Sequence, residues 1–200
     1  MSGNWRDYYE ATAGRPPRRT TLAALAGFSQ GGGGRSAVDL GCGDGRDAVE
    51  MLRQGWTVLA IDAEPAAIER LSGRSDLPGT GKLDLSCARF EEIDWPPVDL
   101  VNASFSLPLC PPSAFPRLWR RLCRSLKPGG RFSGQLYGFR DEWAGSSGTT
   151  HHHRTEVERL LSGFDLELFE EEESDALTPR GKTKHWHIFH IVGRKRSNIF

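Results

Sequence analysis

Short apolar runs alternate with amphipathic segments along most of this sequence. The runs at 36–40, 57–62 and 98–103 are rich in consecutive apolar residues, which is typical of parallel strands buried on both faces. Between residues 113 and 126, apolar side chains instead recur at helical spacing, at Phe115, Leu118, Trp119, Leu122 and Leu126. Strands that alternate with helices predict an α/β fold, doubly wound and Rossmann-like, with helices on both faces of a parallel sheet.

The two ends of the chain depart from this alternation. The predicted strands at 164–169 and 185–192 are joined without room for a helix, so we expect them to form an antiparallel pair. At the other end, an aromatic and basic leader precedes a helix that Pro16 and Pro17 open and the glycine run at 31–34 closes. Two hundred residues suit one domain, and we expect residues 1–30 or so to form a separate segment of it.

Composition narrows the choice of partners and compartment. The 26 Lys and Arg residues balance 26 Asp and Glu, so no basic excess points to a nucleic-acid partner. No apolar run approaches the ~20 residues that a membrane helix needs, and the N-terminus lacks the apolar core of a signal peptide. The cysteines show no C-x-x-C spacing, which is typical of reduced thiols in a cytoplasmic protein: Cys42, Cys87, Cys110 and Cys123.

A glycine-rich turn follows the first predicted strand. Its three glycines stand at alternate positions, Gly41, Gly43 and Gly45. Such a turn before a helix lets the backbone approach a ligand closely. The spacing differs from the G-x-G-x-x-G of dinucleotide sites, since Arg46 stands where the last glycine would be. Asp44 and Asp47 flank the turn and would repel a pyrophosphate, whereas they would tolerate a cationic ligand. A plain structural turn is the alternative.

An acid at the end of the next strand strengthens the ligand interpretation. Asp62 ends the run at 57–62 and lies 21 residues after Gly41. An acid at about this distance, at the tip of the second strand, is placed to accept hydrogen bonds from both ribose hydroxyls. The alternative is that Asp62 caps the helix in which Pro65 occupies the first turn. Together the two elements form one β-α-β unit with both contacts in register.

The stretch V-D-L-G-C-G-D-G-R-D-A at 38–48 resembles motif I of the class I S-adenosylmethionine-dependent methyltransferases. S-adenosylmethionine carries a sulfonium, an ammonium and no phosphate, so it suits an acidic glycine-rich loop. The resemblance implies a seven-stranded sheet of order 3-2-1-4-5-7-6 with the last strand antiparallel, and S-adenosylmethionine as cofactor. It implies cofactor contacts at Asp39, Gly41, Gly43, Asp62 and Ala63.

Two further segments of the family's site fall on this chain. After the fourth strand, N-A-S-F places Ala103 at the methionine end and Phe105 near the methyl group, with a core role as the alternative for Phe105. After the third strand the family has an acid against the adenine amino group. Here Arg89 stands at that position and Phe90 follows, so stacking by Phe90 is the expected adenine contact. N-A-S-F also differs from the N/D-P-P-Y/F signature, which argues against methylation of nucleobase amines.

Three segments resemble the tellurite-resistance methyltransferases, a group similar in style to the thiopurine-type enzymes. They are W-R-D-Y-Y-E-A-T-A-G-R-P-P, G-Q-L-Y-G-F-R-D-E-W and K-H-W-H-I-F-H-I-V-G-R-K. The resemblance implies that the leader closes over the cofactor as a lid, with Trp5, Tyr9 and Arg15 as contacts and Arg15 as donor to the methionine carboxylate. Ordinary packing of the leader on the domain is the alternative for Trp5 and Tyr9.

The same resemblance points to a small-molecule acceptor, such as a chalcogen oxyanion or a thiol. A thiolate or chalcogen anion needs no general base. Arg140, with Asp141 beside it, follows the fifth strand and is the candidate to hold an anionic substrate; a structural salt bridge is the alternative.

Two rival functions remain from the sequence. One is transfer to a hydroxyl or amine, with a base from the run 151–153, and the other is binding of S-adenosylmethionine without catalysis. The histidines at 151–153 are expected in a solvated turn, and His185 and His187 share a strand face without an obvious acid or thiol partner, so we assign no metal.

Overall fold

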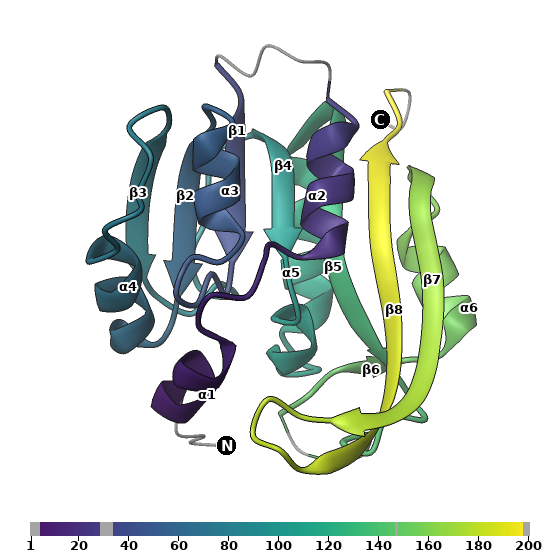
Figure 1. The fold of residues 1–200 in the computed structure, drawn as a ribbon. Helices are drawn as coiled ribbons and strands as arrows, with labels where there is room; N and C mark the ends of the chain where they lie inside the picture. The colour runs from purple at the N-terminus through teal and green to yellow at the C-terminus, as the bar shows by residue number, and fades with distance from the viewer. Residues whose placement is uncertain (1–4, 29–33, 147, 198–200) are drawn as a thin grey trace.

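The computed structural model describes residues 5–28, 34–146 and 148–197. Its described strands form one sheet of order β3-β2-β1-β4-β5-β8-β7, with the short β6 beside β5 (Figure 1). The strands are β1 Ser36–Leu40, β2 Thr57–Asp62, β3 Lys82–Cys87, β4 Val98–Ala103, β5 Leu126–Gly138, β6 His151–His152, β7 Phe164–Leu177 and β8 Thr183–Lys195.

Strand directions confirm the predicted topology. The pairs β1–β2, β1–β4, β2–β3 and β4–β5 are parallel, whereas β8 is antiparallel to both β5 and β7. The predicted sixth and seventh strands are therefore β7 and β8, and β6 is an addition that the sequence pattern did not show. The fold is a doubly wound, Rossmann-like α/β sheet.

Helices cover both faces of the sheet (Figure 1). They are α1 Trp5–Thr12, α2 Arg19–Ala26, α3 Ala48–Arg53, α4 Pro65–Ser72, α5 Phe115–Ser125 and α6 Arg154–Leu160, with a 3₁₀ turn at Leu107–Leu109. Side chains of α2, α3 and α4 belong to one buried cluster, and those of α5 and α6 belong to another. No described helix is long and apolar enough to cross a membrane.

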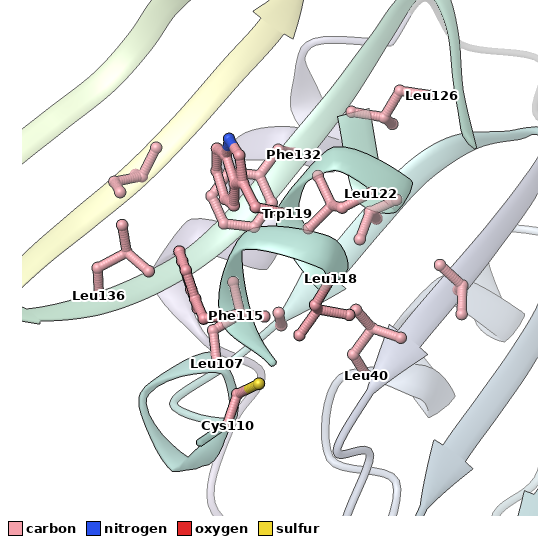
Figure 2. Packing of buried hydrophobic residues seen from close by; sticks show 14 of the residues in the cluster. Leu40, Leu107, Cys110, Phe115, Leu118, Trp119, Leu122, Leu126, Phe132 and Leu136 are labelled. Carbon is pink, nitrogen blue, oxygen red and sulfur yellow. The ribbon is translucent and has the colours of Figure 1, made fainter. Parts of the chain in front are cut away.

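The larger cluster forms where α5 lies on the sheet (Figure 2). The predicted helical stripe is buried as expected, with Leu118 and Leu122 fully enclosed. Trp119 packs edge-on against Phe132 of β5, with ring centroids 5.2 Å apart. Burial of this stripe explains why the segment is helical. Its four arginines and one proline lie on the other face or in the first turn, where they do not interrupt the stripe.

The closing hairpin is longer than its apolar pattern predicted. Apolar alternation in β7 ends near Phe169, yet the strand continues to Leu177 and pairs in register with β8 down to Thr183. Most of the extra residues are acidic, and the carboxylates of Glu170, Glu171 and Glu173 pair with arginines, so ion pairing contributes to the stability of this part of the strand. The hairpin tip and α1 lie at the same end of the sheet, the one at which the parallel strands finish (Figure 1).

Two other segments differ from the sequence expectation. Residues 5–12 of the leader form α1, where no element was predicted, and β5 starts at Leu126 rather than after the K-P-G-G stretch. Of the glycine run at 31–34, only Gly34 lies within the described residues.

Candidate functional site

The glycine-rich turn lies at the carboxyl end of β1 and has little room for side chains. Gly41 has φ +70°, and a Cβ there would stand 2.5 Å from the Cβ of Ser106. Ser106 in turn donates a 2.5 Å hydrogen bond from its hydroxyl to the carbonyl of Leu40. The turn is thereby packed against the segment after β4, which is the place where the order of strands reverses. In open α/β sheets ligands bind at this point.

Asp62 joins the tip of β2 to the glycine turn. Its carboxylate accepts hydrogen bonds from the backbone N–H of Gly43, at 2.8 Å, and of Glu64, at 2.9 Å. Burial raises the pKa of Asp62, and these two N–H donors oppose that rise. The bond to Glu64 forms an Asx-type turn before α4, whose N-cap is Glu64, so the alternative that Asp62 caps this helix is wrong. Ala63 lies between these residues.

Asp39 lies at the floor of the site with one oxygen unsatisfied. Oδ1 accepts a 2.8 Å hydrogen bond from the side-chain amide of Asn102, and Oδ2 is buried with no partner among the described residues. Burial, and then the charge of Asp47, raise the pKa of Asp39 well above its usual range. A buried carboxylate in this state is stabilised by a cation or a donor from a ligand. The residues therefore fit the ammonium-bearing cofactor that motif I implies.

Two polar residues near the ends of β4 and β5 were not selected by sequence reasoning. Asn102 is fully buried. Its amide nitrogen donates hydrogen bonds to the carboxyl groups of Asp39 and, at 3.3 Å, of Asp47. Its amide oxygen accepts a hydrogen bond from the hydroxyl of Thr21 at 3.0 Å. Gln135 of β5 accepts the N–H of Phe105 at 2.9 Å. The signal for Asn102 was available, because it is a polar side chain near the carboxyl end of a mostly apolar strand.

Phe105 has a strained backbone. Its φ is +59°, the one positive φ recorded for a described residue other than glycine, and such conformations cluster at functional sites. The guanidinium carbon of Arg18 lies 4.4 Å from the centroid of its ring. Ala103, the other residue predicted here, is fully buried at the end of β4.

The leader helix lies against the glycine turn. Tyr9 is 3% exposed, and its Cε1 is 3.3 Å from where a Cβ of Gly43 would stand. Trp5 stacks on Tyr9 with ring centroids 6.4 Å apart. Arg15, expected at the methionine carboxylate, is exposed and lines a cavity of about 220 Å³ together with Asp44 and other residues of the leader, α3 and the segment after α4.

The segment after β3 separates its two predicted residues. Arg89 is half-exposed and bound to Glu91, and it lies 3.4 Å from Glu92. Phe90 is half-buried, with its Cε1 3.7 Å from where a Cβ of Gly41 would stand. Phe90 thus reaches the glycine turn, whereas the guanidinium of Arg89 is held by carboxylates.

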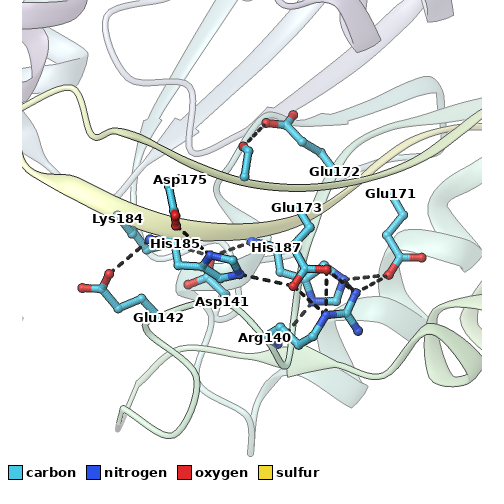
Figure 3. A network of polar contacts seen from close by, with 11 residues as sticks. Arg140, Asp141, Glu142, Glu171, Glu172, Glu173, Asp175, Lys184, His185 and His187 are labelled. Carbon is cyan, nitrogen blue, oxygen red and sulfur yellow. Dashed lines mark hydrogen bonds and ion pairs between the residues drawn. The ribbon is translucent and has the colours of Figure 1, made fainter.

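Arg140 and Asp141 have different partners from those expected (Figure 3). The Arg140 guanidinium is 56% exposed and binds Glu171 at 3.0 Å and Glu173 at 2.8 Å. Asp141 is fully buried and binds the ammonium of Lys184 at 2.5 Å. Both residues are therefore drawn into ion pairs with the β7–β8 hairpin rather than with each other, which is a structural role of the kind that the salt-bridge alternative describes. A role of the pair in substrate binding remains a prediction.

The solvated turn expected at 151–153 is wrong. His151 and His152 form β6 and are each 9% exposed, because β6 pairs with the end of β5. His152 packs on Phe115 at 4.7 Å, and burial lowers its pKa to about 4, so it is neutral at physiological pH. His151 lies on the other side, with Nε2 3.7 Å from an oxygen of Asp141. His153, the remaining member of the run, is exposed and stacks on Phe139 at 4.1 Å.

Within the described residues, no group of three or more histidine, cysteine or acidic side chains is arranged to hold a metal ion. The expectation that His185 and His187 lack an acid partner is wrong, because each lies against a carboxylate of β7: His185 against Asp175 at 2.8 Å and His187 against Glu171 at 2.8 Å.

Comparison with known proteins agrees with this site. Residues 37–130 match the family described as a methyltransferase domain, a stretch that contains the glycine turn, Asp62 and the β4 tip. Comparison with curated protein sequences finds no significant match. The family match over residues 37–130 and the order of strands make the chain similar to the class I S-adenosylmethionine-dependent methyltransferases.

Among solved structures, the chain is similar to TehB from Haemophilus influenzae, with a TM-score of 0.75 and 14% identity over 95% of this chain. It spans 66% of that longer protein. It is also similar to ChlM, the magnesium protoporphyrin IX methyltransferase from Synechocystis, solved with bound cofactor (TM-score 0.69, 11% identity, 97% of this chain and 92% of that one). At these identities, the likeness establishes a shared fold.

A third similar structure holds an acceptor. It is 1,6-didemethyltoxoflavin-N1-methyltransferase from Burkholderia thailandensis with bound 1,6-didemethyltoxoflavin and S-adenosylhomocysteine. Its TM-score is 0.64 and its identity 21%, over 96% of this chain and 80% of that one.

Proposed function

We propose that this protein methylates a small-molecule acceptor that binds beyond the carboxyl ends of β4 and β5, with a chalcogen oxyanion or a thiol as the acceptor. The observation that carries the proposal is the unsatisfied, buried oxygen of Asp39 beneath the glycine turn. A positively charged ligand would supply the missing partner and favour the ionised carboxylate. Asn102, which binds the other oxygen of Asp39, precedes Phe105, the residue with the strained backbone, by three positions.

The cofactor contacts follow from this placement. Asp39 would receive the ammonium group, and the backbone of the turn at Gly41 and Gly43 would lie along the ligand. Asp62 would accept the ribose hydroxyls, because its carboxylate is already fixed at the edge of the turn by two N–H donors. Phe90 would cover the adenine, with Ala63 beside it.

When bound, S-adenosylmethionine supplies a methyl group on a sulfonium that is electrophilic without further activation. The protein then has to align the acceptor and exclude water, and alignment alone can lower a barrier by about 7 kcal/mol in favourable cases. Phe105 is held for this task by its N–H bond to Gln135. Tyr137 and Phe105 provide adjoining aromatic surfaces, with centroids 6.5 Å apart.

Two similar structures support a small acceptor, since one is a 1,6-didemethyltoxoflavin-N1-methyltransferase and the other a magnesium protoporphyrin IX methyltransferase. A soft anion would need no base. The alternative is a hydroxyl or amine acceptor with His151 as base, which one observation favours: Nε2 of His151 is buried without a hydrogen-bond partner among the described residues. Its ring lies 5.9 Å from that of Tyr137.

The test is turnover with methyl-labelled S-adenosylmethionine and a panel of selenite, tellurite, thiols, phenols and amines. We expect label in methylated selenium, tellurium or sulfur products, with a rate that follows the ionisation of the acceptor. Label confined to phenol or amine products, with a bell-shaped pH profile near neutrality that His151→Gln abolishes, would replace this proposal with the alternative.

A further inference from the structure

We propose that Arg18 is the residue that binds the anionic group of the acceptor. The inference rests on the proposed function, which it deepens by naming a substrate class: a small molecule with a soft nucleophile and a carboxylate or oxyanion. Arg18 lies in the leader just before α2, and neither its position nor its sequence context marked it as a site residue.

A hydrogen bond to Asp47 fixes the backbone of Arg18. Its backbone N–H donates a 2.7 Å hydrogen bond to Oδ1 of Asp47, the acid that shares Asn102 with Asp39. Its side chain is half-buried and extends over Phe105, with the guanidinium carbon 4.4 Å from the ring centroid. The cation therefore stands directly over the strained residue at the tip of β4.

The charge of Arg18 is not neutralised by an ion pair with any described carboxylate. Arg19, the next residue in the chain, differs in this respect and binds Glu170 at 2.5 Å. Arg140 and Arg154 both bind Glu171, at 3.0 and 2.7 Å. A guanidinium that is held over a ring still has its edge donors available, and these suit a carboxylate or oxyanion in a bidentate geometry.

The surroundings of the guanidinium define the rest of the acceptor. The Phe105 ring contacts Tyr137, at 6.5 Å, and His190, at 6.2 Å. Tyr137 is buried, and the positive charge of Arg18 opposes the rise that burial causes in the pKa of its phenol. An acceptor held by Arg18 would thus place its remaining atoms against aromatic surfaces, which favour polarisable groups such as sulfur or an aromatic ring.

The test compares two thiols that differ in charge, 4-mercaptobenzoate and 4-methylbenzenethiol, in wild type, Arg18→Gln and the matched control Arg19→Gln. We expect Arg18→Gln to raise KM for 4-mercaptobenzoate by about 10-fold or more and to leave KM for 4-methylbenzenethiol within about twofold. Affinity for S-adenosylhomocysteine, measured by calorimetry, should stay within about twofold, and Arg19→Gln should match wild type in all three measurements.

Equal losses for both thiols, or a loss of S-adenosylhomocysteine affinity with KM unchanged, would overturn the inference and assign Arg18 to the cofactor. If wild type methylates neither thiol, the proposed thiol activity fails on its own. Calorimetric binding of 4-mercaptobenzoate and selenite to the S-adenosylhomocysteine-loaded protein then decides the inference: it stands if binding is lost in Arg18→Gln alone, and it falls if neither anion binds wild type or both variants bind equally.

Discussion

The carboxylate of Asp62 accepts a 2.8 Å hydrogen bond from the backbone N–H of Gly43, so the tip of β2 is fastened to the glycine turn that follows β1. Two motifs that lie 19 residues apart in sequence thereby act as one surface. The bond fixes where the carboxylate can meet ribose hydroxyls, and it makes the effect of changing Asp62 predictable.

Replacing Asp62 should weaken cofactor binding. Asp62→Ala removes acceptors for two hydroxyls, and hydrogen bonds to a charged group contribute roughly 1.5–3 kcal/mol each, so the Kd for S-adenosylhomocysteine should rise at least about tenfold. Asp62→Asn retains one oxygen and should show a smaller rise. Calorimetry on both variants measures this, and an unchanged Kd in Asp62→Ala would remove Asp62 from the cofactor site.

Replacing Asp39 should raise the thermal stability of the protein and weaken its binding of the cofactor. The raised pKa of Asp39 means that the folded protein binds a proton more tightly than the unfolded chain does. Its contribution to stability is therefore most favourable at low pH and is lost as the pH rises above the usual range for Asp through the raised value. Asp39→Asn should raise Tm at pH 8 in the absence of cofactor, and the difference from wild type should shrink toward pH 5.

The same variant should bind S-adenosylhomocysteine about tenfold or more weakly, since a charge-assisted contact is lost. Thermal melts across the pH range and calorimetry at pH 8 provide the two measurements. A lower Tm together with unchanged affinity would contradict the role given to the unsatisfied oxygen.

Lys184 should contribute strongly to the free energy of unfolding. Its ammonium group is enclosed by Trp186 at 3.6 Å, Trp143 at 4.2 Å and Tyr137 at 5.0 Å, and it neutralises the buried Asp141. Lys184→Met leaves that carboxylate unpaired, which typically costs about 3–5 kcal/mol of unfolding free energy.

The matched control for this change is the double variant Lys184→Met with Asp141→Asn. It removes both charges and should recover a large part of the loss in urea denaturation. A double variant as unstable as Lys184→Met alone would show that packing of the lysine stem, rather than its charge, stabilises the region.

The leader should be protected when cofactor binds. α1 contacts the glycine turn through the buried Tyr9, so a ligand seated on that turn would be covered by the same helix. Limited proteolysis within residues 5–15 should slow when S-adenosylmethionine is added, and Tyr9→Ala should reduce that protection. Equal cleavage rates with and without cofactor would leave Trp5 and Tyr9 as ordinary packing residues.

The alternation of strands and helices, the glycine turn and the position of Asp62 could be predicted from the sequence, because each depends on neighbours in the chain. The order of the strands was implied by the resemblance to the class I methyltransferases. Apolar runs of strand length, helical periodicity in α5 and three alternating glycines are local patterns, and a parallel β-α-β unit brings its two strand tips together by connectivity alone. Motif I and Phe90 were found at the turn for this reason.

The partners of charged side chains depended on which strands became neighbours. Arg140 meets Glu171 and Glu173 only because the long β7–β8 hairpin lies beside the segment after β5, and an ion pair forms with whichever opposite charge the fold brings within about 4 Å. The burial of His151 and His152 followed from a two-residue pairing with β5, too short to leave a periodic signal. Arg18 reaches Phe105 across 87 positions of sequence, the difference between their residue numbers, because α2 packs over β5 and β8. Contacts of this kind come from tertiary packing, and no local pattern encodes them.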